Sequence, residues 1–243
     1  MLCGANSEIE LCKIIQDENF WDEWKDTSAH DAPPTDFYSD KYNLMMDVMK
    51  VEDNTRKTKK GKLRNPKAEA ENRLYRALID KGVITDRAPD VQINAVTDLP
   101  TMEDHQFKWY FDSFKRVILE HNRKIPLYNE NHKNFKTVFF VFDESTAYIQ
   151  LLAGQTYSAP KKGQKYTVYI NQLHFFANDA KFQDVLKKCD ADYVIWYAPY
   201  KYYDHGSLPQ PIYQAAIIDI QMLKKGECES LNYLHGLMVS AEE

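Results

Sequence analysis

The stretch from Pro33 to Asp53 carries charged side chains inside an almost continuously apolar run. Such a run is typical of a strand that is buried on both faces. A charge inside a buried strand is costly unless it is paired or bound to a metal ion. Asp47 and Lys50 therefore need partners from elsewhere in the chain, and this need constrains the fold. The apolar residues of the run are Leu44, Met45, Met46, Val48, Met49 and Val51.

Pro33 and Pro34 come just before this run and end the element that precedes them. We expect a short strand over 36–38, a turn over 39–41 and the long strand over 42–52. Together they form a hairpin, residues 33–53, that we place at the centre of the domain.

The rest of the chain alternates between helical and extended patterns. We expect one α/β domain over 1–243, with a central mixed β-sheet flanked by helices. Apolar periodicity and capping residues predict the helices, and short β-type apolar runs predict the strands. The expected helices are about 7–26, 66–81, 102–123, 179–188, 211–223 and 231–239, and the further strands are 91–96, 136–144, 147–152, 166–170 and 192–198.

The composition is that of a globular protein, with 44% hydrophobic and 28% charged residues in 243. A mean hydropathy of -0.59 and the absence of long apolar runs argue against a membrane span. The amino-terminal residues lack the pattern of a secretory signal, so we expect a cytoplasmic protein. The four cysteines form no CxxC pair, and we expect free thiols.

Acidic side chains and a lysine fall where a metal-dependent phosphodiesterase would need them. Such an enzyme requires carboxylates that converge on a metal ion and a lysine that stabilises charge or orients water. Asp36 lies on the first strand of the expected hairpin, and Asp47 and Lys50 lie on the second. A hairpin can bring an acid of one strand beside an acid of the next.

Pro34-Thr35-Asp36 followed by Asp47-Val48-Met49-Lys50 resembles the motif of the PD-(D/E)XK nuclease superfamily. The resemblance implies a restriction-endonuclease-like fold, a Mg²⁺ or Mn²⁺ cofactor and hydrolysis of nucleic-acid phosphodiester bonds. It implies that Asp36 and Asp47 hold the metal and that Lys50 assists the attacking water. A glutamate on the first helix, Glu8 or Glu10, is the further candidate of the family pattern, and we take Glu10.

The chain departs from the family spacing, because two residues separate Asp47 from Lys50 where the family has one. In a regular strand these two side chains point to opposite faces. A bulge near Met49 would be needed to bring them together. The alternative is a non-catalytic α/β protein that binds a protein or nucleic-acid partner, in which Asp47 and Lys50 form a structural ion pair.

A basic segment, residues 55–65, follows the hairpin and contains six cations between positions 56 and 64. We expect a loop there, either a phosphate-contacting loop for nucleic acid or a solvated surface loop. The cations are Arg56, Lys57, Lys59, Lys60, Lys62 and Arg64.

Two other places are weaker candidates for a site. Asp143 and Glu144 end a buried strand, where active-site acids often lie in open α/β sheets. The aromatic and polar segment 197–205 follows the last buried strand and could stack on bases or sugars. The seven histidines are scattered and form no HExxH or HxH pattern.

Overall fold

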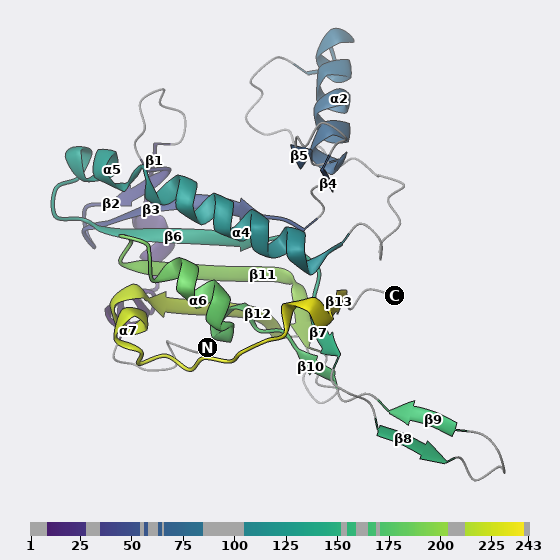
Figure 1. Ribbon diagram of the computed structural model, residues 1–243. Helices are drawn as coiled ribbons and strands as arrows, with labels where there is room; N and C mark the ends of the chain where they lie inside the picture. The colour runs from purple at the N-terminus through teal and green to yellow at the C-terminus, as the bar shows by residue number, and fades with distance from the viewer. Residues whose placement is uncertain are drawn as a thin grey trace.

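A six-stranded mixed sheet organises the protein, in the order β1-β2-β3-β6-β11-β12 (Figure 1). The structure is a computed structural model that describes residues 9–27, 35–53, 56–57, 63–64, 66–84, 105–151, 155–158, 165–168, 171–203 and 212–240. The strands of this sheet are β1 (Lys25–Asp26), β2 (Phe37–Ser39), β3 (Leu44–Val51), β6 (Lys136–Asp143), β11 (Tyr193–Tyr203) and β12 (Ile212–Asp219).

The three central strands run parallel, and the strands outside them pair antiparallel. Asp47 of β3 lies opposite Phe139 of β6, and Tyr193 of β11 lies opposite Val138. The hairpin of β2 and β3 and the strands predicted at 136–144 and 192–198 are present. The predicted α/β class, a central mixed sheet flanked by helices, is therefore confirmed.

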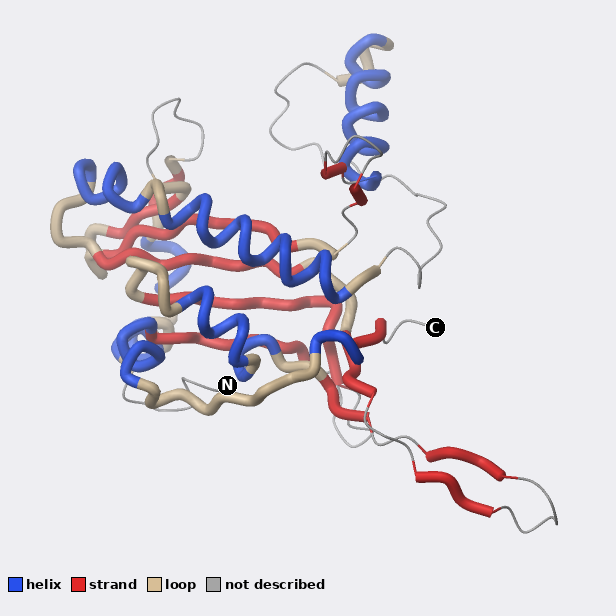
Figure 2. Tube along the Cα trace, in the orientation of Figure 1, coloured by secondary structure: helices blue, strands red, loops and turns tan. Residues whose placement is uncertain are grey.

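Helices cover the two faces of the sheet unequally (Figures 1 and 2). The face toward the viewer is covered by α4 (Phe107–Asn122) and α6 (Ala180–Leu186), and α5 (Ile125–Asn131) extends this layer. The other face is met by the short helix α1 (Glu10–Ile14) and the 3₁₀ turn η1 (Phe20–Glu23). α7 (Ile220–Lys225) follows β12.

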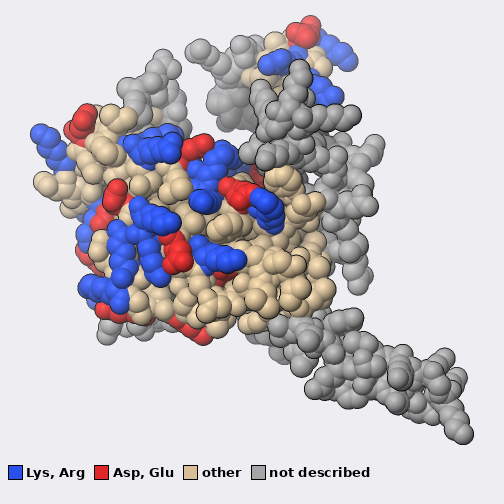
Figure 3. Space-filling model, in the orientation of Figure 1, with Lys and Arg blue, Asp and Glu red and all other residues tan. Residues whose placement is uncertain are grey.

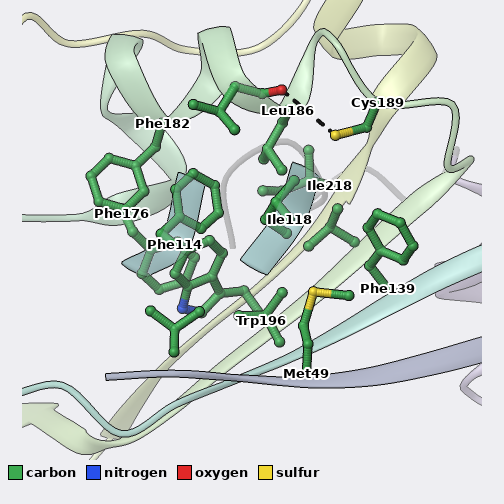
Figure 4. Packing of buried hydrophobic residues seen from close by; sticks show 14 of the residues in the cluster. Met49, Phe114, Ile118, Phe139, Phe176, Phe182, Leu186, Cys189, Trp196 and Ile218 are labelled. Atoms are coloured by element: carbon green, nitrogen blue, oxygen red, sulfur yellow. Dashed lines mark hydrogen bonds between the residues drawn. The ribbon is translucent and has the colours of Figure 1, made fainter. Parts of the chain in front are cut away.

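The larger core lies between the sheet and the layer of α4 and α6 (Figure 4). Phe114 of α4 stacks on Phe182 of α6 at 4.6 Å between ring centroids and lies 4.9 Å from the Trp196 ring of β11. Met49 of β3 and Phe139 of β6 belong to the same core and lie to the right of these rings in Figure 4. Burying these large apolar groups is the main force that holds the helices on the sheet.

Smaller elements extend from the carboxyl end of the central strands. A three-stranded sheet has the order β10-β7-β13, and β4–β5 and β8–β9 form two hairpins. The remaining elements are β4 (Arg56–Lys57), β5 (Leu63–Arg64), α2 (Pro66–Asp80), β7 (Tyr148–Leu151), β8 (Gln155–Ser158), β9 (Lys165–Val168), β10 (Asn171–Leu173), η2 (Phe176–Asn178), η3 (His235–Leu237) and β13 (Met238–Ser240).

Several sequence predictions are wrong or too long. In the described part of the helix expected over 7–26, only α1 and the 3₁₀ turn η1 form, because Asp17 accepts a hydrogen bond from the Asn19 N–H and starts a turn between them. The helix expected over 211–223 is strand β12 followed by α7, since β12 pairs with β11. The weak helix over 231–239 is η3 and β13.

Other expectations meet the structure in part. Helix α2 agrees with the prediction over 66–81, and Gly82 ends it with a φ of 67°. The basic segment contains the β4–β5 hairpin rather than only a loop. The strand predicted over 91–96 lies outside the described residues. Cys12 and Cys189 form no disulfide, whereas Cys228 is disulfide-bonded, contrary to the expectation of free thiols.

Replacing Phe114 by alanine tests the core. We expect Phe114→Ala to lower the free energy of unfolding by about 3–5 kcal/mol, because it leaves a cavity between two aromatic rings. Leu127→Ala removes a leucine side chain that is 44% exposed, so we expect a change of at most about 1 kcal/mol. Urea unfolding measures both, and equal losses would contradict the packing described here.

Candidate functional site

The structure brings the two predicted metal-binding aspartates together. Asp36 precedes β2, and its Oδ2 accepts a 2.7 Å hydrogen bond from the Val48 N–H of β3. Burial and the neighbouring Asp47 carboxylate raise the pKa of Asp36 above its ordinary value. The hairpin thus places the two acids side by side, as the sequence suggested.

Asp47 already has protein partners. Its Oδ2 lies 2.5 Å from His121 Nδ1 and accepts a 2.8 Å hydrogen bond from the Tyr128 hydroxyl. These groups come from α4 and α5, which cover Asp47 and leave it only 3% exposed. The buried charge that the sequence could not explain is stabilised by a histidine and a tyrosine.

Lys50 and Glu10 lie away from this pair. The pairing of β3 with β6 is regular from Leu44 to Val51, so Asp47 and Lys50 point to opposite faces. Lys50 Nζ binds Glu52 at 2.9 Å and Glu144 at 2.6 Å. Glu10 of α1 binds Lys136, the first residue of β6, at 2.5 Å. The four residues of the predicted catalytic set do not converge.

The basic segment contributes no described side chain to a site. Arg56 and Lys57 lie in β4 and Arg64 lies in β5, with only their backbone described, and Lys59, Lys60 and Lys62 lie outside the described residues. On the face shown in Figure 3, Lys and Arg are interspersed with Asp and Glu over α4 and α6. The nucleic-acid contact of this segment stays a prediction.

A second group of buried charges lies where the parallel strands end. Asp143, the last residue of β6, is fully buried and accepts hydrogen bonds from Tyr110 at 2.6 Å, Trp196 at 2.9 Å and Lys201 at 2.9 Å. Its other oxygen accepts from the backbone and the hydroxyl of Ser145. The weaker candidate of the sequence therefore has the denser set of contacts.

Lys201 enters the interior through an irregularity of β11. The pairing of β11 with β12 shifts between Ala198 and Tyr202, and Lys201 lies inside this shift. Its Nζ is 4.0 Å from the centroid of the Tyr110 ring, and its side chain is 2% exposed. Burial lowers the pKa of Lys201, while Asp143 acts in the opposite direction.

Asp53, just beyond β3, supports a histidine. Its Oδ2 accepts hydrogen bonds from the Tyr148 hydroxyl at 2.6 Å and the Thr146 N–H at 3.0 Å. Its Oδ1 lies 2.7 Å from Nδ1 of His105, the residue two places before α4. The carboxylate is 2% exposed and the histidine side chain 21%, so the ring extends from a buried base toward solvent.

Asp179 supports two histidines and caps α6. Its Oδ1 accepts the Lys181 N–H, and its Oδ2 lies 2.9 Å from His174 Nε2 and 2.6 Å from His235 Nε2. Burial lowers the pKa of His174 to about 4. Burial alone would raise the pKa of Asp179, but hydrogen bonds from the two histidines outweigh it and lower the value to about 2.

His105 and His235 line one cavity, which we call the edge pocket. Its volume is about 350 Å³. The Phe107 ring lies 4.6 Å from the His235 ring, which fixes the wall between α4 and η3. His105 and His235 thus reach the same pocket, each backed by a buried carboxylate. The pocket is lined by His105, Gln106, Phe107, Lys108, His235, Met238, Val239 and Ser240.

Sequence reasoning missed His105 and His235. They are 130 positions apart and belong to no short motif, so only the folded chain brings them together. The position of Asp143 at the end of a buried strand was the available signal, because open α/β sheets bind ligands beyond the carboxyl ends of their strands. That signal indicated the edge of the sheet at which Asp143 and the edge pocket lie.

Comparisons with protein-family models, curated proteins and solved structures found no match. Within the described residues, no group of three or more His, Cys, Asp or Glu side chains could hold a metal ion. No helix in that part of the chain has the length and apolar character to cross a membrane. The cytoplasmic location stays a prediction.

The pKa of His174 predicts a loss of stability in acid. The folded ring takes up a proton near pH 4, whereas the unfolded ring does so near 6.5. The unfolded state binds more protons between these values, so stability falls as the pH drops from 6.5 to 4, by about 3 kcal/mol. Urea unfolding across this window checks it. His174→Gln should lose markedly less stability over the same range, and an unchanged slope would contradict the assignment.

The Lys201–Asp143 pair predicts strong coupling. We expect Lys201→Met to cost about 3–5 kcal/mol, because it leaves a buried carboxylate without its cation. Adding Asp143→Asn removes that uncompensated charge and should recover part of the loss. A double-mutant cycle of unfolding free energies measures the coupling, and additive effects would show that the two groups act independently.

Proposed function

We propose that this chain is an acid–base phosphodiesterase that cleaves RNA in the edge pocket. The observation that carries the proposal is that His105 and His235 line the same cavity. His105 is held by a contact with Asp53, and His235 by a contact with Asp179. A buried carboxylate fixes the orientation of an imidazole through a hydrogen bond to one ring nitrogen. Two such rings at one pocket suit a reaction that removes a proton at one atom and delivers it at another.

RNA cleavage has this requirement, because the ribose supplies its own nucleophile. One imidazole takes the proton of the 2′-hydroxyl, and the 2′-oxygen bonds to phosphorus. The other imidazole, protonated at the start, gives its proton to the 5′-oxygen as the P–O bond breaks. The products are a 2′,3′-cyclic phosphate and a 5′-hydroxyl, and the two rings have exchanged their protonation states.

The rim of the pocket suits a phosphate group. Lys108 supplies a cation, although it also binds Asp112 at the surface. α4 begins beside the pocket, its first turn contains no acidic residue, and Gln106 makes no side-chain capping hydrogen bond. The amides of such a helix start favour an anion. These features support the proposal, which the two histidines carry.

A metal-dependent nuclease of the PD-(D/E)XK type, with a restriction-endonuclease-like fold, is the second candidate. The adjacency of Asp36 and Asp47 favours it. Against it, Lys50 lies on the other face of the sheet and Asp47 is engaged by His121 and Tyr128. The described residues around the pair do not form a set of Mg²⁺ or Mn²⁺ ligands, so no step is assigned to a metal.

Cleavage of RNA and DNA oligonucleotides, in EDTA and in Mg²⁺ or Mn²⁺, tests the proposal. We expect RNA to be cut in EDTA with cyclic phosphate ends, and DNA to remain intact. His105→Gln and His235→Gln should each reduce the rate by on the order of 10²–10⁴, the contribution of one acid or base. His132→Gln is the matched control, since His132 packs against Tyr38 and Phe135 outside the pocket.

Two results would contradict the proposal. Metal-dependent cleavage that Asp36→Asn abolishes and His235→Gln leaves intact would establish the second candidate. No cleavage of either substrate by the folded protein would favour the non-catalytic protein that binds a partner. Circular dichroism of each variant shows whether a loss of activity is a loss of folding.

A further inference from the structure

The face of the sheet opposite α4 and α6 is covered only in part. α1 and η1 pack on the beginning of the central strands through Phe20, Leu44 and Val138. Beyond them an apolar row crosses four strands by direct pairing. Parallel strands normally have both faces covered, so it is unusual that this row is covered only in part. It consists of Val48, Phe140, Ile195 and Ile217.

A cavity of about 430 Å³ lies over this row, and we call it the back groove. Trp21 forms one wall and is 57% exposed, and Val48 at the end of the row is 37% exposed. The lining is almost entirely apolar. The residues are Ile15, Trp21, Phe140, Ile195, Trp196, Tyr197, Ala215, Ala216 and Ile217.

Helix α2 also has an apolar side that is covered only in part, because Leu78 is half-buried and Leu74 is exposed. Over residues 72–84 no side chain is buried, and Leu74 and Val83 are 41% and 65% exposed. Leu74 and Leu78 lie one turn apart on one side, and Arg73 and Arg76 lie on the other. Figure 1 shows α2 clear of the sheet. A helix of 15 residues is marginal in water without packing.

We propose that α2 docks through Leu74 and Leu78 into the back groove of its own chain. In α/β domains the apolar face of a sheet packs against the apolar side of a helix. The back groove is such a sheet face, and the side of α2 with Leu74 and Leu78 is such a helix side. Docking in this orientation keeps Arg73 and Arg76 in water.

The covalent connection favours the same chain over a second copy. α2 follows β3, whose Val48 ends the apolar row, and 20 residues of sequence, 85–104, separate the end of the α2 segment from the segment that begins α4. Fully extended, such a segment spans roughly 70 Å, which is enough to reach either face of the sheet. A tethered helix meets its groove at an effective concentration on the order of millimolar.

Engineered disulfides in the full chain test the docking. Leu78→Cys on α2 is combined with Ala215→Cys in the groove, where Ala215 is exposed. The control combines Arg76→Cys with Ala215→Cys, since position 76 lies about 160° around the helix from 78. We expect an intramolecular bond in the first pair that forms about tenfold faster than in the control, identified by mass spectrometry.

A bond between two chains would assign the groove to a second copy, and equal rates for the two pairs would show that α2 does not dock by this side. Either result overturns the proposal. A second measurement is hydrogen exchange of the α2 amides, which docking should slow. Ile217→Asp in the groove should restore fast exchange, whereas protection that survives this change would also overturn it. Neither result depends on the chemistry of the edge pocket.

Discussion

The buried carboxylates of Asp53, Asp143 and Asp179 hold together the segments around the edge pocket. A carboxylate removed from water requires hydrogen-bond donors or cations around it. Asp143 obtains them from α4 and β11, Asp53 from β7 and the residues before α4, and Asp179 from His174, from the first turn of α6 and from η3. Each aspartate thus ties together segments that are distant in the sequence.

These ties also explain why His105 and His235 share a pocket. Each ring contacts a buried carboxylate that requires hydrogen-bond donors in the folded protein. The position of each ring therefore follows from the packing of the core. Asp47 is also stabilised by hydrogen-bonding partners, but these partners, His121 and Tyr128, cover it beneath α4 and α5. A buried aspartate in or beside a strand therefore predicts that hydrogen-bonding partners surround it. Partners that are covered, as at Asp47, have a structural role, whereas partners that reach solvent, as at Asp53 and Asp179, can form a site.

The sequence predicted the framework better than the site. Strands such as β3 and β6 are long apolar runs, and α4 has a clear periodicity, so local pattern suffices for them. β12 was mistaken for a helix because its apolar residues suit either element until β11 is beside it. The convergence of Asp36 and Asp47 was predictable from the hairpin. The separation of Lys50 from Asp47 depends on whether β3 bulges, and the meeting of His105 and His235 depends on long-range contacts.

We propose that His105 and His235 act as base and acid in the edge pocket. The most direct measurement is the pH dependence of the RNA cleavage rate in EDTA, for the native protein and for His105→Gln and His235→Gln. We expect a bell-shaped profile in the native protein and the loss of one limb, a different one, in each variant. A rate that rises with pH without a second limb, or a profile that neither variant changes, would contradict it.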